Sequence, residues 1–249
     1  MNVPVEVVQA TAERRCALFV GRRASLEAVV DADGVYPDQR KLARLFKGRV
    51  SLREACVAYE QRLGRPALQA ALQAHLAVPE AAPGDFHLRA VRRFDRIFTT
   101  CWDSLFERAA EQASRRVKVV LPGEEIPEGS PDELVLVKLW GDFAQPDSLI
   151  VTGQEAQARA LIEQKKTVRR ILRKQVCFFV GYRPDEEEFD LLFDALSEAY
   201  GGELPRCHLA VAQGRISDYH WQKWVWRGLL LFMADPSEAL QALEAQVDA

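Results

Sequence analysis

The sequence lacks several features that mark particular classes of protein. No run approaches the ~18 apolar residues of a membrane-spanning helix. The first ten residues lack the basic start and apolar core of a secretory signal peptide. Acidic and basic side chains nearly cancel, to a net charge of -3, so the bulk basic character typical of nucleic-acid binding is missing. We therefore expect a cytoplasmic protein without a membrane or nucleic-acid partner.

Cysteine and histidine are too few and too scattered for a metal site. The cysteines form neither an even set nor a C-x-x-C pair, and no two histidines have an H-E-x-x-H spacing. We expect reduced thiols, no bound metal, and histidines with surface or satisfied core roles. The residues concerned are Cys16, Cys56, Cys101, Cys177, Cys207, His75, His87, His208 and His220.

What the chain does have is the pattern of an α/β protein. Its 249 residues are 48% hydrophobic and 28% charged, which suits one large globular domain over residues 1–249. Short apolar runs alternate with helix-like stretches, which predicts a Rossmann-like, doubly wound, mostly parallel sheet. The expected strands are 16–20, 96–99, 117–121, 134–139, 176–180, 207–212 and 228–233.

A long segment between the first two runs has helical signals and no strand-like run. The sequence SLRE at 51–54 is typical of a capping box, and residues 26–93 are predicted to form a helical subdomain within the domain. Later, residues 185–200 predict a helix that ends at Gly201, and Ser237 is the expected N-cap of the C-terminal helix.

Ligands of open α/β sheets bind beyond the carboxyl ends of the strands, so the segments after the strands are the candidate site. Four of them carry polar or glycine-containing sequences: GRRAS at 21–25, TTCWD at 99–103, KLWGD at 138–142 and GYRPD at 181–185.

In this order and spacing, the four segments resemble the bacterial sirtuin-like (silent information regulator-like) domain family. Its members usually carry Gly-Ala-Gly-x-Ser, Thr-Thr-Asn-Tyr-Asp, Lys-Leu-His-Gly-Asp and Gly-Tyr-Ser there, and the similarity runs from the first strand to the C-terminus. The resemblance implies binding of NAD or an ADP-ribose-like nucleotide. The residues it places at that nucleotide are Gly21, Arg22, Arg23, Ser25, Thr100, Gly141, Gly181 and Tyr182.

The resemblance also implies that the catalytic pattern is degenerate. The family's His, implied to be the general base, is Trp140 here, and its Asn is Cys101. Indole only donates a hydrogen bond, and loss of a positioned base costs ~10²–10⁴ in rate. We interpret Trp140 as a packed aromatic that fills the site, in preference to a platform for a nucleotide base. No catalytic residue is intact, and Asp103 and Asp142 are the candidates for a residual role.

Several alternatives stay open at this point. Cys101 as a nucleophile is disfavoured, because no histidine is tied to it by sequence. The pair Arg22 and Arg23 either binds phosphate from the rim of the loop or is a solvated pair. The aromatic and basic stretch at 220–227 is interpreted as core packing, since Trp221 and Trp224 share a helix face, and not as a nucleic-acid platform.

The leading hypothesis is a non-catalytic module that senses a nucleotide or binds a partner in a bacterial defence or signalling system, within a larger protein or complex. One alternative is an active NAD hydrolase acting in antiphage defence, in which Ser25, Asp103 or Asp142 polarises water. Another is a pure protein-interaction module with a filled pocket. The sequence gives no sign of the oligomeric state.

Overall fold

Seven parallel strands form one sheet in the computed structural model, which describes residues 2–28, 52–76, 81–130, 132–151, 165–202, 204, 207–211 and 216–249. The strand order is β3-β4-β2-β1-β5-β6-β7. The strands are β1 (Cys16–Val20), β2 (Arg96–Thr99), β3 (Arg116–Val120), β4 (Glu133–Lys138), β5 (Val176–Val180), β6 (Cys207–Val211) and β7 (Leu229–Met233). The chain reverses its direction of winding between β1 and β5, so the switch point lies between these two strands.

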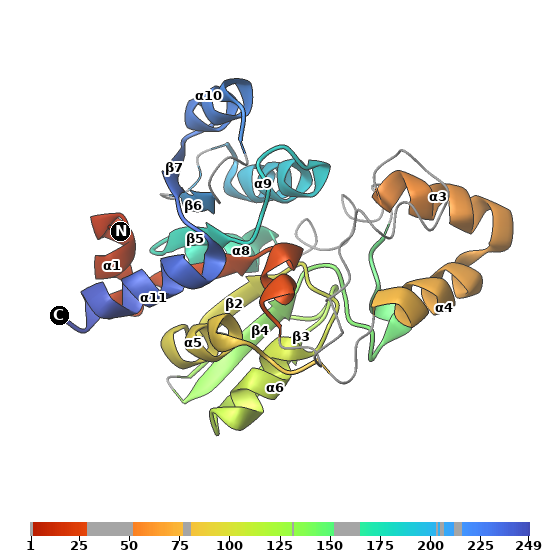
Figure 1. Ribbon diagram of the computed structural model, residues 1–249, viewed down its shortest axis with the longest axis horizontal. Helices are drawn as coiled ribbons and strands as arrows, with labels where there is room; N and C mark the ends of the chain where they lie inside the picture. The colour runs from red at the N-terminus through yellow and green to blue at the C-terminus, as the bar shows by residue number, and fades with distance from the viewer. Residues whose placement is uncertain are drawn as a thin grey trace.

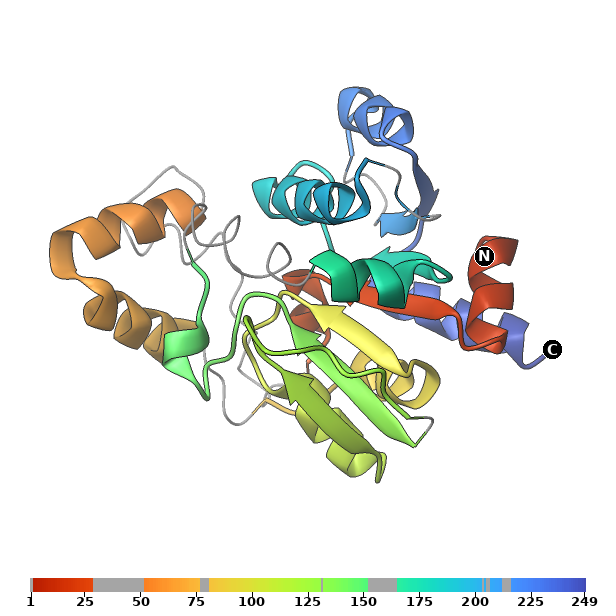
Figure 2. The ribbon, with the colours of Figure 1, turned by 180° about the vertical axis from the view of Figure 1, so that it is seen from behind.

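Helices cover both faces of the sheet, as Figures 1 and 2 show from opposite sides. One layer contains α1 (Val5–Ala12), α5 (Asp85–Arg93), α6 (Leu105–Gln112) and α11 (Pro236–Val247). The other contains α8 (Lys165–Leu172), α9 (Glu187–Tyr200) and α10 (Asp218–Trp226). The predicted Rossmann-like, doubly wound fold is confirmed. Three strands match their expected bounds to the residue, because uninterrupted apolar runs are what a strand buried on both faces requires.

The side chains on the two faces of β1 pack into two separate hydrophobic cores. Phe19 points into the core beneath α8 and α9, whereas Leu18 and Val20 point into the core beneath α1, α5 and α11. The ring of Phe19 stacks between Phe98 of β2, at 4.6 Å between centroids, and Phe179 of β5, at 4.7 Å. This row of rings joins the three central strands.

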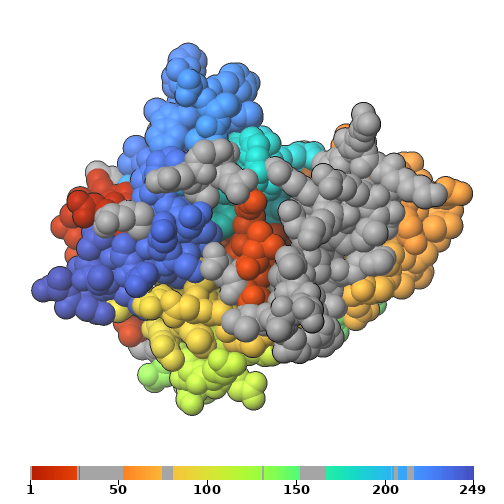
Figure 3. Space-filling model, viewed as in Figure 1, coloured from red at the N-terminus to blue at the C-terminus, as the bar shows by residue number. Residues whose placement is uncertain are grey.

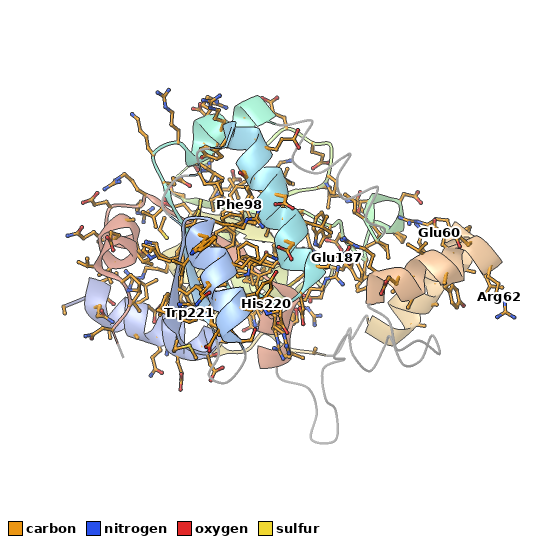
Figure 4. The ribbon with its side chains drawn as sticks, turned by 90° about the horizontal axis from the view of Figure 1, so that it is seen from above. Glu60, Arg62, Phe98, Glu187, His220 and Trp221 are labelled. Carbon is orange, nitrogen blue, oxygen red and sulfur yellow. The ribbon has the colours of Figure 1, made fainter. Side chains whose placement is uncertain are left out.

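A helical hairpin of α3 (Leu52–Leu63) and α4 (Arg65–Leu76) stands beside the sheet, and Figure 4 shows Glu60 and Arg62 on it, far from Phe98 in the sheet. Its buried face joins the core, and Gln69 donates a hydrogen bond to the carbonyl of Pro146 in η2 (Pro146–Ser148), at 2.7 Å. By contrast, α5 packs against α6 and α11 on the sheet itself.

The expected subdomain over 26–93 lies partly outside the described residues, which omit 29–51 and 77–80, and its bounds stay a prediction. The first residue of the expected capping box, Ser51, is also outside them.

One predicted helix end is confirmed by the structure and another is wrong. Gly201 ends α9 in the left-handed conformation, with φ 74°, as predicted. The N-cap of α11 is Asp235, and the prediction of Ser237 is wrong. Pro236 has no N–H to satisfy and so suits the first helical position, which moves the cap to the residue before it. No described helix combines the length and apolar character needed to cross a membrane.

The row of rings predicts where stability is concentrated. Phe19→Ala should lower the free energy of unfolding by about 3–5 kcal/mol, because it leaves a cavity between two fixed rings. Val5→Ala, on the exposed side of α1, is the matched control and should change it by less than about 0.5 kcal/mol. Urea unfolding measures both. A loss below about 1 kcal/mol for Phe19→Ala would contradict the central role of this row.

Candidate functional site

The turns after β1 and β5 meet at the switch point and touch through backbone atoms. Gly21 donates its N–H to the carbonyl of Val180 at 2.9 Å, and Arg23 donates to the carbonyl of Gly181 at 3.2 Å. A Cβ on Gly21 would lie 2.5 Å from the Gly181 oxygen, so only glycine fits there. Gly181 itself has a φ of 75°, which also favours glycine. The two predicted glycines are therefore needed for this contact, whatever else they do.

The segment after β2 lies against the first turn. Ser25, in the short helix η1 (Arg22–Glu27), donates a hydrogen bond to Oδ2 of Asp103 at 2.6 Å and lies 3.4 Å from Sγ of Cys101. Thr100 donates its N–H to the carbonyl of Val20, at the end of β1, at 3.1 Å. The structure thus brings Gly21, Ser25, Thr100, Cys101 and Asp103 together at one end of the sheet.

Cys101 is buried in this cluster. Burial, reinforced by the charge of Asp103, raises its pKa to about 12. The nucleophile in cysteine chemistry is the thiolate, and an apolar environment favours the protonated thiol. Cys101 is accordingly a neutral thiol and not a poised nucleophile.

Arg22 points inward. Its guanidinium carbon lies 3.7 Å from the centre of the Trp102 ring, and its Nε donates to the carbonyl of Thr100 at 3.3 Å. Glu188 of α9 forms an ion pair with it at 3.6 Å. Arg22 is therefore no member of a solvated pair: it closes the space between the first turn and α9.

Trp140, at the position of the family's His, is 2% exposed and belongs to the main core. Its carbonyl accepts a hydrogen bond from Nε1 of Trp102 at 2.8 Å, which links it to the Arg22 stack. Its own Nε1 is buried without a hydrogen-bond partner. Indole here fills space and is not presented to solvent.

Gly141 and Asp142 hold the turn that follows Trp140. Gly141 has a φ of 86°, and a Cβ there would lie 2.2 Å from the Ser148 carbonyl oxygen. Asp142 is buried and lies 2.5 Å from Nζ of Lys138, which is also buried and contacts Glu107 at 2.8 Å. Burial alone would lower the pKa of Lys138, but the two carboxylates outweigh it and raise that pKa. Asp142 is thus engaged in a structural ion pair.

The other candidate acid is engaged as well. Asp103 accepts from Ser25 and, through Oδ1, from the N–H of Leu105 at 3.1 Å, at the start of α6. His87 lies near Asp103 but is fully buried, with Nδ1 accepting from the N–H of Gly84 at 3.2 Å and Nε2 without a partner. Burial lowers the pKa of His87 to about 4, so its ring is neutral and enclosed. Asp103 is thus held by Ser25 and by the start of α6, and His87 is enclosed in the core.

A hollow of about 140 Å³ opens next to the Gly21 and Gly181 contact, at the carboxyl ends of β5 and β6 and the start of α11. Tyr182 is one wall, and burial raises the pKa of its hydroxyl well above the ordinary value. Arg23 and Arg183 also line it, and Arg183 forms ion pairs with Asp185 and Glu186. The lining residues are Arg23, Leu26, Gly181, Tyr182, Arg183, Pro184, Ala210, Val211, Asp235 and Pro236.

Sequence reasoning missed the walls at the end of β6, Ala210 and Val211, and those after β7, Asp235 and Pro236. The rule that carboxyl ends of parallel strands meet would have included them, but no motif marks these two strand ends. Among the described residues, no three or more His, Cys, Asp and Glu side chains gather as metal ligands do.

Comparisons with known proteins give one family and one fold. A family model described as a SIR2-like domain matches residues 95–228. A structure solved for "Structural Basis for the Mechanism and Regulation of Sir2 Enzymes" is similar with a TM-score of 0.55 and 13% identity, covering 99% of this chain and 98% of that one. At this identity the likeness shows the fold alone. No curated protein sequence matches the chain.

The burial of Cys101 predicts inert thiols. All five cysteines are buried, so the native protein at pH 8 should react with an aromatic disulfide reagent only as fast as it unfolds. Addition of denaturant should expose all five at once. A single fast-reacting thiol in the native state, mapped to Cys101 by mass spectrometry, would contradict this account and revive a nucleophilic role.

Proposed function

This chain belongs to the SIR2-like domain family, and from that premise we propose that it binds the adenosine side of an NAD- or ADP-ribose-type nucleotide without cleaving it. One contrast carries the proposal. The position of the family's base is a buried Trp140, whereas a hollow beside the same turns stays open to solvent.

The hollow is sized for part of a nucleotide. Its volume of about 140 Å³ is below the ~300–1,000 Å³ of pockets that enclose a whole drug-sized ligand, so it suits one part of a dinucleotide. Ala210, Val211 and Pro236 supply apolar walls for a base. Arg23 supplies a guanidinium group, which binds phosphate well, whereas the guanidinium of Arg183 forms ion pairs with Asp185 and Glu186.

The nicotinamide side does not fit in the way the family resemblance implies. Arg22 and Trp102 occupy the space between the first turn and Trp140. The N–H groups of the first turn are also engaged, that of Arg23 with Gly181 and that of Ala24 with Gly21, at 3.0 Å. A pyrophosphate would find few backbone donors there. We therefore derive no catalytic step at this site.

In keeping with the resemblance, we place this binder in a bacterial defence or signalling system, where nucleotide occupancy would be read by a partner protein. This role is distinct from the alternatives of an NAD hydrolase and of a pure interaction module. Binding and turnover experiments separate all three.

Titration calorimetry with ADP-ribose tests binding directly. The wild-type protein should give saturable heat, and Arg23→Ala should weaken binding about 10–100-fold, the loss of one charge-assisted hydrogen bond. Arg62→Ala, on the exposed side of α3, is the matched control and should bind as the wild type does. Absence of heat with ADP-ribose, NAD and NADP would overturn the proposal in favour of a pure interaction module.

A nicotinamide-release assay tests the loss of turnover. The wild type and Trp140→His should both stay at background, because Cys101 and the Arg22–Arg23 loop would still misplace the substrate, and groups that act as a unit are not additive. The combined change Trp140→His, Cys101→Asn, Arg22→Ala and Arg23→Gly should be the first variant with measurable cleavage. Turnover by the wild type that Asp103→Ala abolishes would establish the NAD hydrolase instead.

A further inference from the structure

The two edges of the sheet are protected very differently. At one edge, β3 has the sequence RVKVV, with Arg116 and Lys118 exposed. Charged side chains of this kind keep an edge strand from pairing with other chains. At the other edge, β7 has the sequence LLLFM and carries no charge. Among the described residues it pairs with β6 alone. This edge strand is uncharged and apolar, as expected of a strand that pairs with another chain.

Apolar side chains at this edge face solvent. Leu230 of β7 is 50% exposed, and Met233, on the opposite face of the strand, is also exposed. The neighbouring helix α10 adds Tyr219, 71% exposed, and Trp226, 89% exposed. Tyr219, Gln222 and Trp226 are spaced i, i+3 and i+7, so they form one stripe along the helix. Figure 3 shows α10 projecting at this end of the molecule, and Figure 4 labels His220 and Trp221 on it.

The exposed stripe is not the side by which α10 joins the fold. Trp224 is fully buried against Phe189 and Phe193 of α9, at 4.6 and 5.1 Å between ring centres. Lys223 and Arg227 form ion pairs with Asp190 of α9. The helix is held firmly by one side and presents large aromatic groups on another. For the predicted core packing of 220–227, Trp224 is buried as expected and Trp221 is half-buried, whereas Trp226 of the same stretch is exposed.

We propose that β7 together with the exposed stripe of α10, the β7–α10 face, binds a second copy of this chain across a two-fold axis. In an antiparallel β7–β7 pair each strand satisfies the outer backbone groups of the other, and no like charges meet. The two seven-stranded sheets would then join into one.

The helices support the same arrangement. A helix that precedes a parallel strand in a doubly wound sheet runs antiparallel to it, so the two-fold axis sets the start of one α10 beside the end of the other. Tyr219 would then lie near Trp226 of the partner subunit. The acidic start at Asp218 would likewise lie near the basic end of the other helix, which is favourable for both helix dipoles.

The size of the face also favours a second copy. Each exposed aromatic side chain contributes about 150–250 Å² when buried, so Tyr219, Trp226 and their aliphatic neighbours offer several hundred Å². That is a large share of the ~800 Å² per partner in a standard interface, and apolar patches of this size are often functional. An extended peptide would cover the strand and leave the helix bare. A second copy covers both.

Sedimentation equilibrium over a concentration series of the full chain tests the proposal and needs no nucleotide. The wild type should be a dimer of 28.1 kDa subunits. Leu230→Lys places a charge on the edge, and Trp226→Ala removes the largest exposed ring, so each should raise the dissociation constant tenfold or more. Leu63→Lys, at an exposed position of α3, is the control and should leave the dimer intact. Unchanged thermal unfolding of the separated monomers verifies that the variants fold.

Hydrogen exchange gives a second, mutation-free measurement. Amides of 229–233 should gain protection as protein concentration rises, whereas those of 116–120 at the guarded edge should not. A wild type that stays monomeric throughout the series would overturn the proposal. So would a dimer that survives both Leu230→Lys and Trp226→Ala, or a monomer that protects its β7 amides only when a peptide of another protein is added.

Discussion

The contact between the turns after β1 and β5 sets the geometry of the whole candidate site. Because the Gly21 and Gly181 backbones touch without room for a Cβ, the switch point is closed by main-chain atoms. The segment after Gly21 is thereby turned so that its N–H groups bond within the protein, Arg22 is directed inward and Arg23 outward to the hollow. A dinucleotide fold normally uses this junction to approach a pyrophosphate. Here the same junction has become part of the core.

The side chains around that junction complete the change. Arg22 stacks on Trp102, and Trp102 donates to the carbonyl of Trp140, so one stacking contact and one hydrogen bond link the first turn to the position of the family's His. Restoring one of these residues leaves the others in place, which is why we expect several replacements together, and no single one, to be needed for turnover. The ion pair of Lys138 with Asp142 fixes the turn beneath it.

The sequence predicted those features that depend on local residue patterns, and it did not predict contacts between residues far apart in the chain. Strand positions followed from uninterrupted apolar runs, and the end of α9 followed from Gly201, because both are local requirements of burial and backbone conformation. The stack of Arg22 on Trp102 joins residues 80 positions apart, and no local pattern encodes it. Trp224 and Trp226 look alike in sequence, yet one is in the core and one in solvent, because two positions on a helix turn by about 200°.

The two proposed surfaces meet at the end of one strand. Asp235 and Pro236 line the hollow, and they follow Met233, the last residue of the edge strand β7, by only two and three positions. A nucleotide bound in the hollow as proposed would therefore contact the backbone that leaves the proposed dimer interface. By linkage, if dimer formation alters nucleotide affinity by some factor, nucleotide must alter dimer affinity by the same factor. Asp235, the N-cap of α11, lies between the two surfaces, so we expect any coupling between nucleotide binding and dimer formation to pass through it.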